Sequence, residues 1–172
     1  MKKHTRFLAE AGLIAAAYAA ATYLCSLWGL AYGEVQFRFS EALTILPLFT
    51  PAAIPGLTIG CFIANIGSPF GVVDMIIGTI ATLLAAIGVH MVRNIKWKGI
   101  NWIAPMLPVI ANAVLVGLEI SWFLPEGLTF MGFIGAALSV GLGELVVCYG
   151  LGLPLSIAID KIPALKRMFS KN

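Results

Sequence analysis

Charge is scarce in this sequence. Only 11% of the 172 residues are Asp, Glu, Lys or Arg, whereas 60% are hydrophobic, and the mean hydropathy is +0.96. Soluble domains carry about a quarter charged residues and about half apolar residues. The composition therefore excludes an ordinary soluble domain. Because apolar runs occupy most of the length, they also leave no room for a soluble catalytic domain.

Several motifs of energy-coupled and catalytic proteins are also missing. There is no Walker A motif, so we expect no ATPase activity in the chain itself. No internal repeat is evident, which weakens the case for a secondary transporter built from inverted repeats. Cys25, Cys61 and Cys148 lie in apolar segments without Cys-x-x-Cys or Cys/His spacing, which favours small buried side chains. We therefore expect no metal site, no cofactor and no enzymatic activity.

Apolar runs of about 20 residues, long enough to cross a bilayer, recur along the chain. Four are plain, at residues 10–31, 72–92, 102–124 and 129–159. Residues 39–66 are harder to interpret because Pro47, Pro51 and Pro55 interrupt them. The pair Thr50–Pro51 is typical of a helix cap followed by a first-turn proline. The segment is either one kinked span or two short helices that turn near Thr50.

The distribution of Lys and Arg decides between these two arrangements. The basic residues form three clusters: Lys2, Lys3 and Arg6; Arg93, Lys96 and Lys98; and Lys161, Lys166, Arg167 and Lys171. With six spans all three clusters face the cytoplasm and only Arg38 lies outside, whereas five spans would put two clusters outside. The sequence therefore predicts an all-α integral membrane protein, a single domain over residues 1–172 with six transmembrane helices. Both termini are expected in the cytoplasm, and the second and third helices are expected to be short.

Polar residues interrupt these helices on the side that is expected to face outward. They are Gln36 and Arg38 in the first outer loop, Glu41 about one turn into the second helix, Asn65 at the end of the third, Asn112 and Glu119 on the fifth, and Glu144 on the sixth. Asn112 and Glu119 share a helix face because they are seven residues apart. Carboxylates inside membrane helices are costly and usually functional, which favours a role for Glu119 and Glu144. We predict that these residues line a substrate-binding cavity open to the outside.

Structural roles stay open for some of the polar residues. Arg38 and Glu41 are three residues apart, and an interfacial ion pair would explain both. Asn65 could simply end its helix, and Asn112 could form a hydrogen bond between helices. Asp74 and Glu126 are expected to be solvated or to cap the starts of helices.

The first helix is rich in alanine. Ala15 and Ala19 are four residues apart, and so are Ala16 and Ala20. Small residues at this spacing let two helix backbones approach closely. They could pack inside the protein or against a partner subunit, and the sequence leaves the register of the contact open.

Three segments give the sequence a specific resemblance. They are QFRFSEALTILP (Gln36–Pro47), NAVLVGLE (Asn112–Glu119) and GELVVCYGLGLP (Gly143–Pro154), with Asn65 between the first two. Together they resemble the QueT family, and the resemblance extends over nearly the whole chain. Members of this family are substrate-binding S components of energy-coupling factor (ECF) transporters, proposed to take up queuosine precursors.

The resemblance implies a six-helix fold that binds its substrate from the outside, with the first outer loop as a lid. The implied partners are a transmembrane coupling subunit, two ATPase subunits, a small 7-deazaguanine substrate and the lipid bilayer, with no nucleic acid. The coupling subunit is expected to dock on small residues of the first helix. Ala15, Ala16, Ala19 and Ala20 are therefore the candidate interface residues.

Other functions stay open beside this one. A self-contained proton-coupled carrier, or a small intramembrane enzyme, could use Glu119 and Glu144. Neither a nucleophile nor a metal set supports the enzyme. An S component for a different vitamin is a further alternative, because the same fold can accept other ligands by changing side chains.

Overall fold

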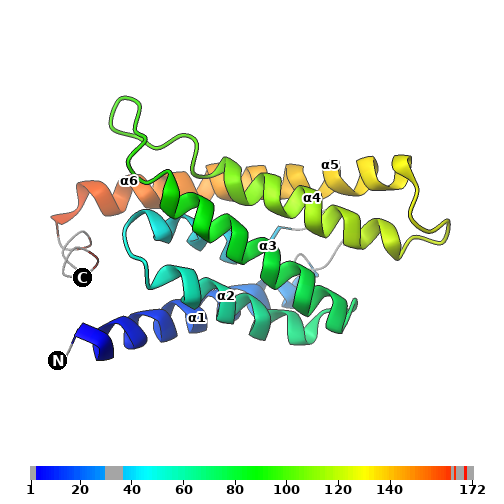
Figure 1. Cartoon of the computed structure of the whole chain (residues 1–172), viewed down its shortest axis with the longest axis horizontal. Helices are drawn as coiled ribbons and strands as arrows, with labels where there is room; N and C mark the ends of the chain where they lie inside the picture. Colours follow the sequence, from blue (N-terminus) through cyan, green and yellow to red (C-terminus); the bar gives the residue numbers. More distant parts are fainter. Residues whose placement is uncertain (1–2, 30–36, 164, 166–168, 170–172) are drawn as a thin grey trace.

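The computed structural model describes residues 3–29, 37–163, 165 and 169. Its elements are α1 (Lys3–Leu27), the 3₁₀ helix η1 (Phe39–Leu48), α2 (Ala53–Ala64), the 3₁₀ turn η2 (Asn65–Gly67), α3 (Val72–Met91), α4 (Met106–Trp122), α5 (Phe130–Val147), the π-helical segment η3 (Cys148–Gly152) and α6 (Leu153–Lys161). The helices lie side by side along one axis (Figure 1). The only β pairing within these residues is an isolated bridge between Trp97 and Ile100. The predicted all-α class is thus confirmed.

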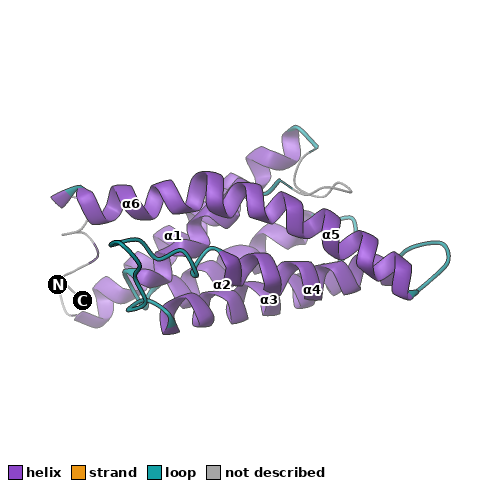
Figure 2. Cartoon of the chain, turned by 90° about the horizontal axis from the view of Figure 1, so that it is seen from above, coloured by secondary structure: helices purple, strands orange, loops and turns teal. Residues whose placement is uncertain are grey.

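Three stretches are long and apolar enough to cross a membrane by themselves, namely α1, α3 and the continuous run Phe130–Lys161. Figure 2 shows this last run, labelled α5 and α6, as one long helical rod. The segments Phe39–Leu48, Ala53–Gly67 and Met106–Trp122 are shorter apolar helices. The prediction of short second and third helices is therefore confirmed, while six complete crossings remain a prediction.

The turn between η1 and α2 follows from its prolines. Pro47 lies inside η1, where it removes a backbone N–H and opposes continuation as an α-helix. Pro55 lies in the first turn of α2, where a missing N–H costs little. The expected cap at Thr50 is wrong in detail, because α2 begins only at Ala53 and has no side-chain cap. The Thr50 hydroxyl instead accepts a hydrogen bond of 3.3 Å from the N–H of Ala52 in the turn.

The helix ends gather at two opposite ends of the molecule. The start of α1, the η1–α2 turn, the α3–α4 loop and the end of α6 lie at one end, on the left of Figure 1. The described basic residues at this end include Lys3, Arg6, Arg93, Lys96, Lys98 and Lys161. This common location agrees with the predicted even number of passes. Which side of the membrane this end faces remains a prediction from the charge distribution.

Glycines allow the first two α-helices to pack closely. A Cβ atom added at Gly56 would lie 2.8 Å from the backbone oxygen of Ala11, and one at Gly60 would lie 2.8 Å from that of Ala15. Such distances leave no room for a side chain. The Ala11 and Ala15 face of α1 is therefore committed to α2.

This packing divides the alanines of α1 into two faces. Ala15 and Ala19 are buried within the protein, whereas Ala16 and Ala20 are exposed. Of the two registers that the sequence left open, Ala15 and Ala19 pack inside the fold, whereas Ala16 and Ala20 are accessible to another molecule. Docking of a partner on this helix remains a prediction.

Large apolar side chains cover the outside of the bundle. Examples are Leu13, Ile80, Leu84, Leu138 and Leu142, all exposed. Soluble proteins rarely expose apolar surface on this scale. Lipid-facing positions explain it, in agreement with the membrane class predicted from composition.

Candidate functional site

Eight polar side chains from different helices converge in the interior. They are Tyr18 of α1, Arg38 at the start of η1, Glu41 of η1, Asn65 of η2, Asp74 of α3, Asn112 and Glu119 of α4, and Glu144 of α5. We call them the polar cluster. Each is at most 4% exposed to solvent. Because burying a charge costs several kcal/mol unless it is compensated, such a group needs a structural or functional reason.

One part of the cluster is a chain of hydrogen bonds. An Nη2 donor of Arg38 lies 2.9 Å from Oδ1 of Asn65. The Asn65 amide nitrogen donates to the backbone oxygen of Asp74 at 3.0 Å and to its Oδ1 at 3.3 Å. Gly78 makes this possible, because a Cβ there would lie 2.5 Å from the Asn65 amide nitrogen. Asn65 thus holds Arg38 and Asp74 in fixed positions.

A second part surrounds Glu41. The Tyr18 hydroxyl donates a hydrogen bond to Oε1 of Glu41. The Asn112 side chain faces the carboxylates of both Glu41 and Glu144. The Cys148 thiol donates to Oε2 of Glu144 at 3.5 Å. Five helical elements, α1, η1, α4, α5 and η3, therefore contribute side chains here, with two carboxylates and an amide side by side.

Some of these buried polar atoms have no hydrogen-bond partner among the described residues. They are Oε2 of Glu41, Nδ2 of Asn112 and both carboxylate oxygens of Glu119. Asn112 approaches its two carboxylate neighbours without reaching hydrogen-bonding geometry. More than nine in ten buried polar groups in native proteins are paired, so these exceptions need an explanation. Together they present three acceptors and one donor to whatever enters the cluster.

The position of Glu144 depends on an irregular helix. The helix of α5 passes into the π-helical segment η3 directly after Val147, so Cys148 and Glu144 flank this transition. Gly152 lets η3 approach η1, because a Cβ there would lie 3.3 Å from the backbone oxygen of Ala42. Single π-helical turns are frequent at functional sites. Here η3 itself packs against η1, the helix that carries Glu41.

The structure brings together most of the predicted site residues. Those in the cluster are Arg38, Glu41, Asn65, Asn112, Glu119 and Glu144, whereas Gln36 lies outside the described residues. The contacts described for the Arg38 guanidinium are to Asn65 and, at 3.9 Å, to the Cys61 sulfur. Glu126 is exposed, as expected.

Sequence reasoning missed Asp74 and Tyr18. Asp74 was expected to be solvated or to cap a helix, but it is 3% exposed and contacts Asn65. Asp is common at the start of a helix, where it caps the helix or faces solvent, so the position of Asp74 in the sequence did not indicate that its side chain is buried. Tyr18 did leave a signal, because Ile14, Tyr18 and Thr22 follow one another at helical spacing on the buried face of α1.

A comparison with known families decides the assignment. The family model described as the QueT transporter matches residues 8–161. The chain belongs to the QueT transporter family. The matched region contains every member of the polar cluster, from Tyr18 to Glu144. The resemblance noted in the sequence is thereby confirmed, and the family is one of transporters.

A curated relative carries the same family name. It is the queuosine precursor transporter QueT of Lactococcus lactis subsp. cremoris (strain MG1363), which is 35% identical to this chain over 103 residues. The match covers 57% of this chain and 60% of the relative, so the chain spans less than two thirds of the relative's length. No solved structure matches the chain.

Proposed function

We propose that this QueT-family chain is the substrate-binding S component of an ECF importer and captures a 7-deazaguanine-type queuosine precursor from outside the cell. A transmembrane coupling subunit and two ATPase subunits would supply the energy. The observation that carries the proposal is the polar cluster, whose buried donor and acceptors lack partners among the described residues. A polar, multiply hydrogen-bonding ligand would satisfy them.

The atoms between η1, α4 and α5 complement a guanine-type edge. Such an edge presents an N–H and an NH₂ group next to a carbonyl oxygen. Oε2 of Glu41 is an acceptor for the two donors, and Nδ2 of Asn112 is a donor for the carbonyl. Glu144, which faces the same amide, offers a further acceptor. The ring would therefore lie between Glu41 and Asn112.

The end of α4 suits the other group of the ligand. Glu119 lies near its C-terminal end at Trp122, and both its oxygens lack a partner within the described residues. Asp74 is its acidic neighbour on α3. Two adjacent carboxylates favour a cation, and the aminomethyl group of a queuosine precursor is cationic. We therefore assign the ammonium to Glu119 and the ring to Glu41.

The exposed face of α1 is the proposed docking surface for the coupling subunit. Gly12, Ala16 and Ala20 lie on this exposed face, four residues apart. Small side chains at this spacing permit close approach of a second helix.

The test separates binding from transport. The purified chain should bind an aminomethyl deazaguanine in calorimetric titration without any partner. After reconstitution into vesicles it should take up the ligand only together with the coupling and ATPase subunits and with ATP. Uptake by the chain alone, driven by a pH gradient, would instead establish the proton-coupled carrier. Tight binding of an unrelated vitamin but not of deazaguanines would retain the S component and reject the substrate.

A further inference from the structure

A second polar feature lies at the opposite end of the molecule from Glu119. A cavity of about 490 Å³ opens between the end of η1, the α3–α4 loop and α6. It shares no residue with the polar cluster. Four of the side chains that line it are basic: Arg93, Lys96, Lys98 and Lys161. This cavity therefore has its own chemistry, and the proposed binding of deazaguanine does not use it.

The positive charge of the cavity is only partly compensated. Asp160 is the acidic residue in its lining, and its carboxylate lies 2.7 Å from Nζ of Lys96. Within the described residues, neither Lys98 nor Lys161 forms an ion pair with a carboxylate. An anion that enters the cavity could therefore pair with the ammonium groups of Lys98 and Lys161.

Much of the rest of the lining is apolar. Leu48 and Phe49 at the end of η1, Ile100 in the loop and Ile157 on α6 form this part of the wall. The polar side chains of Asn101 and Ser156 make hydrogen bonds within the protein. A small soluble anion would gain nothing from the apolar wall. An amphiphile would place its anionic group among the cations and its hydrocarbon against this wall.

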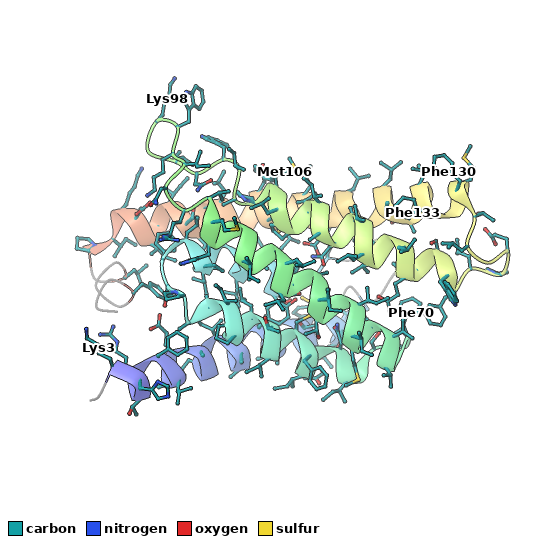
Figure 3. All side chains as sticks on the ribbon, in the orientation of Figure 1. Lys3, Phe70, Lys98, Met106, Phe130 and Phe133 are labelled. Carbon is teal, nitrogen blue, oxygen red and sulfur yellow. The ribbon has the colours of Figure 1, made fainter. Side chains whose placement is uncertain are left out.

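The neighbouring loop has the composition of a membrane interface. Trp97 and Trp102 are 66% and 43% exposed, and Nζ of Lys98 lies 4.8 Å from the centroid of the Trp97 ring. Figure 3 shows Lys98 at the tip of this loop, away from the helices. Exposed Trp residues concentrate at the depth of lipid headgroups. The cavity would accordingly open where phospholipid phosphates are located.

We propose that this cavity binds the headgroup phosphate of an anionic phospholipid. The basic residues alone would be explained by the usual excess of Lys and Arg in cytoplasmic loops. That explanation does not account for a cavity whose lining combines four cations with apolar side chains. Basic pockets between membrane helices are known sites for anionic headgroups.

The test measures lipid binding to single-charge variants. The purified full-length chain is titrated in detergent with phosphatidylglycerol or with phosphatidylcholine, and bound lipid is counted by native mass spectrometry. A basic residue that contacts the anionic headgroup is expected to change the affinity for that lipid about fivefold. Lys98→Gln and Lys161→Gln should each weaken phosphatidylglycerol binding by about this factor. Lys3→Gln, an exposed residue of α1 outside the cavity lining, is the matched control and should bind like the parent.

Thermal unfolding of each variant checks that the fold is retained. The proposal is supported if phosphatidylglycerol binds at least tenfold more tightly than phosphatidylcholine and each cavity variant reduces this preference about fivefold. It is overturned if the cavity variants bind like the Lys3→Gln control, or if both lipids bind equally well. Titration with inorganic phosphate distinguishes the source of the anion. If phosphate displaces phosphatidylglycerol at equal concentration, the site takes a free anion and the lipid proposal is wrong.

Discussion

Replacing Glu119 by Gln tests whether this buried acid binds the ligand or stabilises the fold. Glu119 is 1% exposed, and neither of its oxygens has a hydrogen-bond partner within the described residues. Gln keeps the size and removes the ionisable group. In the ligand-free protein the change breaks no described hydrogen bond and abolishes the desolvation cost of a buried carboxylate. The unfolding temperature of Glu119→Gln should therefore equal or exceed that of the parent.

Ligand binding should change in the opposite direction. In the proposed complex Glu119 accepts a hydrogen bond from an ammonium group, and such charge-assisted bonds contribute about 1.5–3 kcal/mol. Gln would place an NH₂ donor against the ligand donor and lose the charge. The affinity for the aminomethyl deazaguanine should fall roughly ten- to a hundredfold. If Glu119→Gln is as stable as the parent but binds the ligand more weakly, Glu119 serves ligand binding and not the stability of the fold.

Calorimetric titration and thermal unfolding of the same purified samples provide the measurement. Glu126→Gln is the control, because Glu126 is an exposed residue of the α4–α5 loop, and it should leave both quantities unchanged. A deazaguanine without the aminomethyl group should bind the parent and Glu119→Gln almost equally. If Glu119→Gln binds the aminomethyl ligand like the parent, or unfolds at a clearly lower temperature, Glu119 is structural and the assignment of the ammonium is wrong.

Three further predictions follow from the packing and the charge distribution. In a cysteine-free background, Glu126→Cys should react with an impermeant thiol reagent added to intact cells, and Lys98→Cys should not; reaction at Lys98→Cys would contradict the predicted orientation. Ala16→Leu should abolish co-purification with the proposed coupling subunit without changing the stability of the isolated chain, and retention of the full complex would refute the docking face. Ala15→Leu should instead destabilise the isolated chain, because Ala15 packs against α2. Gly117→Ala should lower stability by about 1–3 kcal/mol, since its Cβ would lie 2.8 Å from Cα of Ala137 on α5; an unchanged unfolding temperature would show that α4 and α5 separate without cost.

The helices were predictable because hydrophobic length and proline positions are local properties. The break between η1 and α2 follows from Pro47 and Pro55 alone. The exact start of α2 was not predictable. Threonine is a common helix-capping residue, yet the Thr50 hydroxyl accepts a hydrogen bond from the N–H of Ala52 in the turn. The helix starts three residues after Thr50, at Ala53.

The face of α1 that packs internally also required the structure. The two alanine registers of α1 are equivalent by composition, and each has the spacing that favours close packing. The difference comes from Gly56 and Gly60 on α2, which meet only the Ala11 and Ala15 side. Pairing of helices distant in sequence is not encoded in the periodicity of either helix.

The site illustrates the same limit. The depth and face of Glu41 and Glu144 could be inferred from helix positions, but their meeting around Asn112 depends on the π-helical segment after Val147. No local pattern indicated that irregularity. Asp74 was misjudged for a related reason, since only the fold shows that Asn65 lies against it.

The charges of the polar cluster restrict the ligand further than hydrogen bonding does. Arg38 is the one basic member of the polar cluster, which also contains four acids, Glu41, Asp74, Glu119 and Glu144. The buried group therefore contains more acidic than basic side chains. A vitamin that carries a carboxylate would add to this imbalance in a medium where an uncompensated charge costs several kcal/mol. A cationic ligand reduces it, and one that also presents an N–H/NH₂ edge satisfies the remaining acceptors. If the chain is an S component, as proposed, this excess of acids would favour an aminomethyl deazaguanine over acidic vitamins, in addition to the hydrogen bonding.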